Sequence, residues 1–198
     1  ELKSYLKESK SNYSLLAVSG YNSLKYFDLI LNNTDLLGLV SKETIVSAGH
    51  LFKNYSSNKK NKIFPIDSEH FSIFHQLNQC NHTLNSLTLT ASGGPFLGKN
   101  FNSLKNVTFH QASKHPKWKM GYKNSIDSST LANKCLELIE AMYLFNVSMK
   151  NLDIVIHPEA LIHSIIEYNN STSIFNYFYN DMSIPILNFM EHKEYNLY

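Results

Sequence analysis

Residues 36–55 read LLGLVSKETIVSAGHLFKNY, a short apolar run followed directly by a segment of mixed apolar and polar residues. The apolar run Leu36–Val40 predicts a buried strand, and Glu43–Tyr55 predicts a helix. Upstream, Leu15–Val18 predicts another strand that ends in a turn, and Asn22–Leu31 has the apolar spacing of a helix. Strands and helices that alternate in this way are typical of a parallel α/β unit.

Further along the chain, this alternation gives way to a run of strands. The clearest helix is predicted at Thr130–Phe145, and the polar segment Gly98–Tyr122 is predicted to be a loop or a mobile segment. The other expected elements are a helix at Phe71–Leu77 and strands at Ile63–Ile66, Leu87–Thr90, Asp153–His157, His163–Tyr168 and Ser173–Tyr179. The last three strands indicate an antiparallel or mixed sheet. The expected fold class therefore passes from α/β to α+β.

Composition bounds the class of protein. The 198 residues fit one full domain with part of a second, and the 43% hydrophobic content supports a sizeable core. Charges of both signs are mixed along the chain, which argues against a nucleic-acid partner. No apolar run approaches the roughly 20 residues of a membrane helix. Cys80 and Cys135 form neither a disulfide framework nor a zinc pattern, so we expect a reducing compartment. Because Glu1 is not a methionine, we expect the start of the protein to be missing.

The predicted helix at Thr130–Phe145 has one apolar stripe and one polar face. The stripe consists of Leu131, Cys135, Leu138, Met142 and Phe145, and the polar face of Asn133, Glu137 and Glu140, with Lys134 at the edge. The polar face is either solvated or turned toward a ligand. Residues 126–130 either cap the helix or, with Ser128, Asn133 and Lys134, bind an anion such as a phosphate.

Asp67 and Glu69 follow an apolar strand. In an extended chain these two carboxylates face the same way and repel each other unless a cation or a proton lies between them. Carboxylate oxygens suit Mg²⁺ or Mn²⁺, and Glu137 could add a third. The alternative is a loop whose Asp67 or Ser68 caps a helix.

Two further segments allow both a functional and a structural interpretation. The glycines of Ser92–Pro95 either let the backbone approach a ligand closely or form a plain turn. Trp118 and Met120, in the polar segment His115–Gly121, either form a lid over a ligand or dock the loop on the core. His157 and His163 flank a turn between strands, where structural histidines are expected.

Six stretches, taken in order, resemble the 1-deoxy-D-xylulose 5-phosphate reductoisomerase family. They are Ser41–Gly49 (SKETIVSAG), Pro65–His70 (PIDSEH), Ala91–Phe96 (ASGGPF), His115–Gly121 (HPKWKMG), Asp127–Lys134 (DSSTLANK) and Asp181–Pro185 (DMSIP). Each motif is modest alone, but together they cover most of residues 14–187 in the order of the family.

This resemblance implies a role for each candidate residue. The metal, Mn²⁺ or Mg²⁺, would be held by Asp67, Glu69 and Glu137. Substrate would contact Lys42, Ser68, Glu69, Ser92, His115, Trp118, Ser128, Asn133, Lys134 and Glu137, of which Ser92, Ser128, Asn133 and Lys134 would hold its phosphate. The catalytic residues would be Lys42, Glu69, His115 and Glu137, and the NADPH side would be formed by Ser41, Glu43, Met120 and Gly121.

The implied reaction breaks and remakes a carbon–carbon bond and then reduces the resulting aldehyde with hydride from NADPH. A metal would polarise the carbonyl, and the cofactor would supply the hydride. The family also implies a homodimer, a small sugar phosphate as substrate, no nucleic-acid or membrane partner, and a bacterial cytoplasm or a plastid stroma as the compartment.

The chain departs from the family pattern in several places. It has no G-x-G-x-x-G turn for the dinucleotide phosphates, and Ser41 and Cys135 replace a usual Asn and Gly. We therefore expect residues 1–62 to be the last part of a Rossmann-like NADPH-binding domain, 63–187 the catalytic domain, and 188–198 a divergent tail. Three functions stay open: a piece of an active reductoisomerase, a module that binds metal and sugar phosphate without a redox step, and a decayed gene product.

Overall fold

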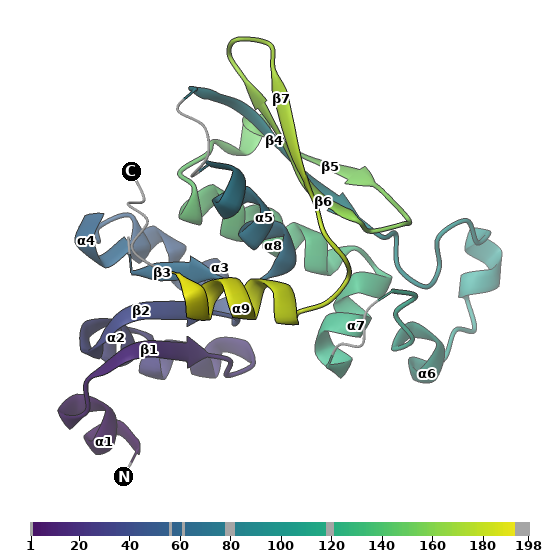
Figure 1. Ribbon diagram of the computed structural model, residues 1–198. Coiled ribbons are helices and arrows are strands. Elements are labelled where there is room, and N and C mark those ends of the chain that lie inside the picture. Colours follow the sequence, from purple (N-terminus) through teal and green to yellow (C-terminus); the bar gives the residue numbers. More distant parts are fainter. Residues whose placement is uncertain (1, 56, 61, 78–81, 118–120, 193–198) are drawn as a thin grey trace.

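The computed structural model describes residues 2–55, 57–60, 62–77, 82–117 and 121–192, which form two sheets (Figure 1). The first sheet is parallel, in the order β1-β2-β3, and consists of β1 (Ser11–Leu16), β2 (Thr34–Leu39) and β3 (Ile63–Pro65). The second is mixed, in the order β5-β4-β6-β7, and consists of β4 (Leu84–Ala91), β5 (Leu152–Ile156), β6 (Ile162–Tyr168) and β7 (Ser173–Tyr177). The predicted passage from parallel α/β to a mixed α+β sheet is confirmed.

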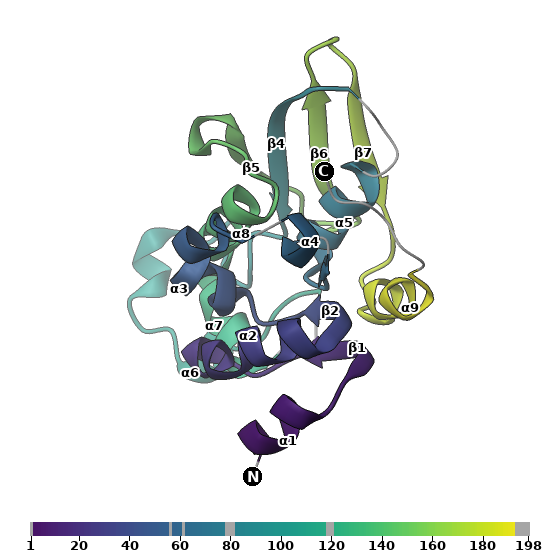
Figure 2. The same cartoon turned by 90° about the vertical axis from the view of Figure 1, so that its left-hand side faces the viewer.

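Helices α5 and α8 lie between the two sheets, and α9 packs near the first (Figures 1 and 2). The helices are α1 (Leu2–Glu8), α2 (Leu24–Asn33), α3 (Lys42–Phe52), α4 (Ser57–Lys60), α5 (Ser68–Leu77), α6 (Phe109–Ala112), α7 (Tyr122–Ser129), α8 (Ala132–Leu144) and α9 (Ser183–Glu191). Three 3₁₀ turns are η1 (Gly20–Ser23), η2 (Phe101–Leu104) and η3 (Met149–Asn151). None of the helices within the described ranges is both long and apolar enough to cross a membrane.

The first sheet buries both faces of β2, as its nearly continuous apolar sequence predicts. Leu37 and Leu39 are fully buried in a cluster with Phe27 of α2. The opposite face meets α9, where a Cβ added to Gly38 would lie 3.1 Å from the ring of Phe189. Side chains that alternate along β2 therefore separate two cores, one under α2 and α3 and one under α9.

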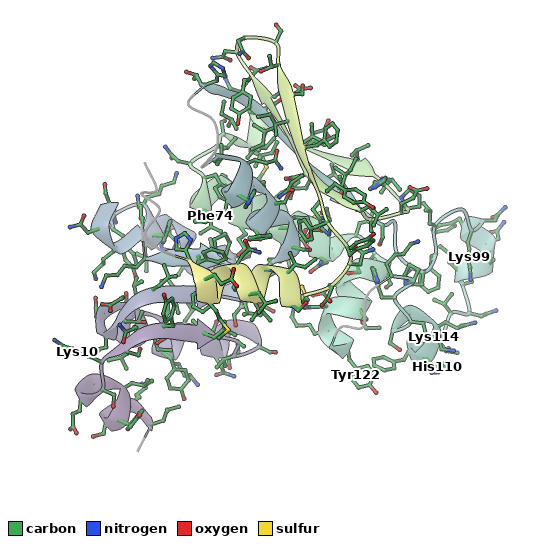
Figure 3. All side chains as sticks on the ribbon, viewed as in Figure 1. Lys10, Phe74, Lys99, His110, Lys114 and Tyr122 are labelled. Carbon is green, nitrogen blue, oxygen red and sulfur yellow. The ribbon has the colours of Figure 1, made fainter. Side chains whose placement is uncertain are left out.

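Helix α5 joins the two halves of the molecule because it has apolar residues on two sides. Ile73 packs with Leu87 and Ile166 of the second sheet. Phe74, labelled in Figure 3, packs instead against Phe64 of β3, with ring centroids 4.9 Å apart. The start of α5 is thereby fixed at the junction of the sheets.

Several predicted boundaries were wrong, among them those of β1 and of the segment Gly98–Tyr122. β1 ends at Leu16, because its pairing with β2 runs from Ser11 and leaves Val18 outside the ladder. The segment Gly98–Tyr122, predicted to be a loop, contains η2 and α6; α6 has a capping box between Thr108 and Gln111. Figure 3 shows the labelled side chains Lys99, His110 and Lys114 pointing away from the rest of the protein on this segment.

The expected helix at Thr130–Phe145 differs most from its prediction. Residues up to Ser129 form a separate helix, α7, and Leu131 then adopts a left-handed conformation with φ of 61° before α8 begins. The buried side chains of α8 are Lys134, Glu137, Glu140 and Ala141. Cys135, expected on the buried stripe, is exposed, and Cys80 lies outside the described residues. The helix therefore turns its charged face inward.

Close packing between α3 and α8 makes Gly49 a sensitive position. A Cβ at Gly49 would lie 2.1 Å from Cδ2 of Tyr143, near the base of a ring that has little room to move. We expect Gly49→Ala to lower the free energy of unfolding by about 1–3 kcal/mol, as overpacking typically does, in urea titrations. Ser47→Ala, on the exposed side of α3, should change it by no more than about 0.5 kcal/mol. A gain in stability for Gly49→Ala would mean that helix propensity outweighs the steric contact.

Candidate active site

A cavity of about 260 Å³ opens where β2, β3 and β4 end and α5 and α8 begin. Its lining includes eleven of the residues that the sequence predicted: Lys42, Asp67, Ser68, Glu69, Ser92, His115, Gly121, Ser128, Asn133, Lys134 and Glu137. Residues from five separate segments thus surround one space. The carboxyl ends of parallel strands are the usual place for such a site in α/β proteins.

Three carboxylates meet on one side of the cavity. Asp67 follows β3, Glu69 lies in the first turn of α5, and Glu137 comes from α8. Their ligand atoms lie within 4.8 Å of one another, close enough to share one cation. The expected extended geometry of Asp67 and Glu69 was wrong, because the helix already begins at Ser68, but the turn still brings both carboxylates to the same place.

Two buried lysines neutralise this acidic cluster. The Nζ atom of Lys42 lies 2.5 Å from Oδ2 of Asp67 and 2.9 Å from Oε1 of Glu137. The Nζ atom of Lys134 contacts Glu69 and lies 2.5 Å from Oε2 of Glu137. Three carboxylates against two ammonium groups leave one excess negative charge when all are ionised. The cluster therefore favours a further cation.

The environment shifts the pKa values of Lys42, Asp67, Glu69 and Lys134. Burial alone would lower the pKa of Lys42, but the neighbouring carboxylates, led by Asp67, raise it well above its ordinary value. Burial raises the pKa of Asp67 to about 7 in spite of Lys42. Burial would also raise the pKa of Glu69, yet the charge of Lys134 outweighs it and holds that pKa below its usual range. Despite burial, the pKa of Lys134 is raised by Glu137 and Glu69 in the same way, so both lysines stay charged at neutral pH.

Polar groups on the other side of the cavity come from α7, α8 and the glycine loop. Ser128 lies near the end of α7, so the predicted capping of a helix by residues 126–130 was wrong, and no side chain caps α8 at Leu131. Asn133 is held by Lys42, whose Nζ donates to its Oδ1 at 3.0 Å, and by Glu137, to which its Nδ2 donates at 2.6 Å. The amide is therefore fixed at the start of α8, beside the free N–H groups of that helix.

The glycine loop approaches this region more closely than any other residue type would allow. Gly94 has φ of 72°, and a Cβ there would lie 2.6 Å from the carbonyl oxygen of Ser128. Ser92, just before it, lies 3.0 Å from Nε2 of His115. Burial lowers the pKa of His115, which favours its neutral form. The loop thus forms a tight turn at the edge of the cavity, and its close approach to a ligand stays a prediction.

Four predicted residues do not line the cavity or cannot be placed. The hydroxyl of Ser41 donates to the carbonyl of Val18 at 2.6 Å, which ties α3 to the end of β1. Glu43 points to Lys123 of α7, at 3.1 Å. Trp118 and Met120 lie outside the described residues. The expected ligand contacts of these four residues therefore stay predictions.

Sequence reasoning missed three residues at or behind the site. His163, predicted to be structural, lines the cavity, where it stacks on Phe178 with ring centroids 3.8 Å apart. His70 and Glu140 are completely buried behind the carboxylates. Their inward direction could have been inferred only from the orientation of α5 and α8, which no local pattern supplies.

Comparison with known proteins places the chain in a family. The family model described as the 1-deoxy-D-xylulose 5-phosphate reductoisomerase C-terminal domain matches residues 63–145. The reductoisomerase of Ehrlichia canis is 43% identical over 178 residues, which cover 89% of this chain and 46% of the relative. That of Clostridium botulinum is 40% identical over 219 residues, covering 98% of this chain and 56% of the relative. The chain thus spans about half the length of the curated relatives it matches.

Solved structures agree with these relatives. A reductoisomerase described as a complex with NADPH, fosmidomycin and magnesium superposes with a TM-score of 0.86 at 32% identity, covering 98% of this chain and 51% of that one. The Zymomonas mobilis enzyme, in complex with NADPH, gives a TM-score of 0.81 at 32% identity and covers 96% of this chain and 48% of that one. Over the part that it spans, the chain belongs to the 1-deoxy-D-xylulose 5-phosphate reductoisomerase family.

Proposed function

We propose that this chain carries the metal- and substrate-binding part of an enzyme that converts 1-deoxy-D-xylulose 5-phosphate to 2-C-methyl-D-erythritol 4-phosphate with NADPH. The observation that carries the proposal is the meeting of Asp67, Glu69 and Glu137 in one cavity with polar groups suited to a phosphate. The relatives and their complexes with NADPH and magnesium support the same reading.

The proposed metal ligands are Asp67, Glu69 and Glu137, with Mg²⁺ or Mn²⁺ as the ion. Their oxygen atoms fit a hard divalent cation by type and by mutual distance. Such an ion, when bound, polarises a carbonyl oxygen of the substrate. The ammonium groups of Lys42 and Lys134 contact the same oxygen atoms, so they would have to give up part of these contacts to it. Freed in this way, the lysines could face the substrate.

The proposed substrate contacts divide into two groups. Ser92, Ser128, Asn133 and Lys134 would hold the phosphate, which supplies binding energy and orientation away from the reacting carbons. Ser68, Glu69 and Glu137 would lie beside the reacting end, and Trp118 would also contact the substrate. Two further substrate contacts are Lys42 and His115. The proposed catalytic residues are Lys42, Glu69, His115 and Glu137. Nδ1 of His115 accepts from the backbone N–H of Lys117 at 3.2 Å, so the neutral ring would carry its proton on Nε2 and donate from there to Ser92 or to substrate.

The proposed NADPH side comprises Ser41, Glu43, Met120 and Gly121. Gly121 lines the cavity, and Ser41 fixes α3 beneath it. We also propose residues 1–62 as part of the NADPH-binding domain, 63–187 as the catalytic domain and 188–198 as a separate tail. β3 extends the parallel sheet past residue 62, and α9 continues past residue 187, so these boundaries are those of function rather than of secondary structure. The proposed compartment is a bacterial cytoplasm or a plastid stroma, of which the bacterial relatives support the former.

An activity assay distinguishes a chain that catalyses the reaction by itself from one that only binds metal and sugar phosphate. NADPH oxidation would be followed with 1-deoxy-D-xylulose 5-phosphate and Mn²⁺, once with the 198 residues alone and once with the chain extended to the length of its relatives. Activity only in the extended protein identifies these residues as a binding module for metal and sugar phosphate within the enzyme. An extended protein that binds both ligands but never oxidises NADPH would contradict the proposed reaction.

Metal binding should stabilise the chain through Glu137. At a concentration 100 times its Kd, Mn²⁺ with a phosphonate hydroxamate should raise the free energy of unfolding by about 2.7 kcal/mol. Glu137→Gln should abolish the metal-dependent part, whereas Glu167→Gln, at an exposed position of β6, should keep it. Thermal unfolding with and without each ligand measures the effect. If the metal shifts the unfolding temperature equally in both variants, Glu137 is not a metal ligand. If the ligands do not shift the unfolding temperature of the parent chain, the site has decayed.

Lys42 should be required for folding mainly when no metal is present. Lys42→Met leaves Asp67 and Glu137 buried without their cation, which typically costs about 3–5 kcal/mol. Saturating Mg²⁺ should recover more stability in this variant than in the parent, because it supplies the missing positive charge. Lys123→Met removes two ion pairs of an exposed lysine, with Glu43 and Asp127, and should cost about 1 kcal/mol or less. Similar losses in both variants, unaffected by Mg²⁺, would contradict this account.

We also propose a homodimer, in line with the family. The second sheet has one face turned away from α5: Ile165 pairs with Phe175 across β6 and β7, on the side opposite Ser164, which contacts α5. Phe175 is 59% exposed and Val155 of β5 is 42% exposed. An apolar sheet face of this kind is typical of an interface.

Sedimentation would test this assembly. The parent chain should sediment as a dimer and Phe175→Asp as a monomer, because a buried unpaired carboxylate opposes association. Tyr21→Asp, at an equally exposed aromatic position on η1, should stay dimeric. A monomeric parent, or a dimer in all three proteins, would exclude this face.

A further inference from the structure

His70 and Glu140 form a buried pair directly behind the carboxylates of the cavity. His70 lies next to Glu69 on α5 and is 0% exposed, while Glu140 lies one turn after Glu137 on α8 and is 1% exposed. The Nδ1 atom of His70 is 3.4 Å from Oε2 of Glu140. Neither residue belongs to the lining of the cavity. Any effect of His70 and Glu140 on the cavity is therefore transmitted through the residues that line it.

The contacts of His70 reach each of the three proposed metal ligands. Its Nε2 lies 2.9 Å from the backbone carbonyl of Glu137, its Nδ1 lies 3.9 Å from Oδ2 of Asp67, and its backbone continues directly from Glu69. A carbonyl oxygen can only accept a hydrogen bond, so Nε2 must be the donor. Nδ1 therefore faces the carboxyl groups of Glu140 and Asp67, at 3.4 and 3.9 Å.

The surroundings hold this pair in a single orientation. The ring of His70 stacks on Phe145, with centroids 6.1 Å apart and an interplanar angle of 12°. The Nδ1 atom and Oε2 of Glu140 are fully buried, and neither has a hydrogen-bond partner elsewhere in the described part of the chain. Buried polar groups are costly unless they pair, so each residue depends on the other. The pair consequently clamps the start of α5 to the middle of α8.

We propose that His70 and Glu140 are positioning residues that set the mutual geometry of Asp67, Glu69 and Glu137 for a divalent cation. This inference rests on the proposed function of those three carboxylates as metal ligands. Partners behind the ligands of a metal site fix the orientation of the ligands, and their loss typically weakens metal binding by about 10–100-fold. The pair occupies that place in this fold, since it spans the two helices that carry Glu69 and Glu137.

Direct metal binding by the pair is the competing explanation. Ligand atoms of Asp67, His70 and Glu140 also lie within 4.8 Å of one another. Nε2 is engaged by the carbonyl of Glu137, however, and Nδ1 and Oε2 face each other only 3.4 Å apart. A positioning role predicts one ion for each chain, whereas direct ligation by the pair predicts a second.

The experiment measures the affinity and stoichiometry of Mn²⁺ alone, from the electron paramagnetic resonance signal of the free aquated ion. Glu140→Leu and His70→Leu should each raise the Kd by about 10–100-fold. The double variant should be little worse than either, because removal of one partner already disables the pair. Glu140→Gln keeps a hydrogen-bond donor toward Nδ1 and should lose less affinity than Glu140→Leu; it serves as the test if the leucine variants do not fold.

A matched control separates positioning from general destabilisation. Gln76, also on α5 and 2% exposed, donates to Ser72 at 3.1 Å and to Ser164 at 2.8 Å, away from the cavity. Gln76→Leu should lower thermal stability and leave the Mn²⁺ affinity at the value of the parent.

The outcomes distinguish the inference from the function on which it rests. If the parent binds Mn²⁺ and the Glu140 variants bind it equally well, or if Gln76→Leu loses as much affinity as they do, the positioning role is wrong. Two ions for each chain would also overturn it. A parent chain that binds no Mn²⁺ overturns the proposed metal ligands themselves, and the positioning role with them.

Discussion

The burial of ionisable side chains along one face of α8 is the constraint on which the rest of the structure depends. Lys134, Glu137 and Glu140 are each no more than 5% exposed. Buried charges are tolerated only when partners meet them with good geometry. Those partners come from the starts of α3 and α5, namely Lys42, Glu69 and His70. Three helices from both halves of the chain must therefore converge on one point, and the two sheets are placed around that convergence.

This constraint explains which parts of the fold could be predicted from the sequence. Strands such as Leu36–Val40 and Leu87–Thr90 were recognisable because their burial is apolar, and apolar periodicity reports it directly. The orientation of α8 could not be recognised from the sequence, because the amphipathic rule assumes that the polar face of a helix is solvated. Here that face is the interior one, and Cys135 on the apolar stripe is exposed. The separate helix α7 was missed since its break from α8 depends on a left-handed residue, Leu131, which carries no usual signal for that conformation.

The candidate site was predictable to a different degree. Motifs close in sequence, such as Asp67 and Glu69, indicated residues that do lie together in one cavity, even though the assumed backbone geometry was wrong. Resemblance then connected them to Glu137, which spacing alone could not do. His70 and Glu140 remained invisible because their importance arises only from a contact between two helices. The pattern is general: side chains that touch a ligand leave local motifs, while those that support them from behind are defined by tertiary packing.

The electrostatic arrangement of these residues bears on folding and on the proposed binding of a metal ion. Lys42 and Lys134 neutralise carboxylates that would otherwise repel one another across less than 5 Å, so the fold does not need a metal ion to bring them together. One negative charge remains in excess, which keeps the cluster attractive to a divalent cation. Because the backbones of α3, α5 and α8 are fixed by packing such as that of Gly49 against Tyr143, an ion that displaces the ammonium groups moves flexible lysine side chains rather than helices. Replacing the ammonium groups by a metal ion would thus require only the side chains of Lys42 and Lys134 to move. The relative positions of the three carboxylates would stay the same.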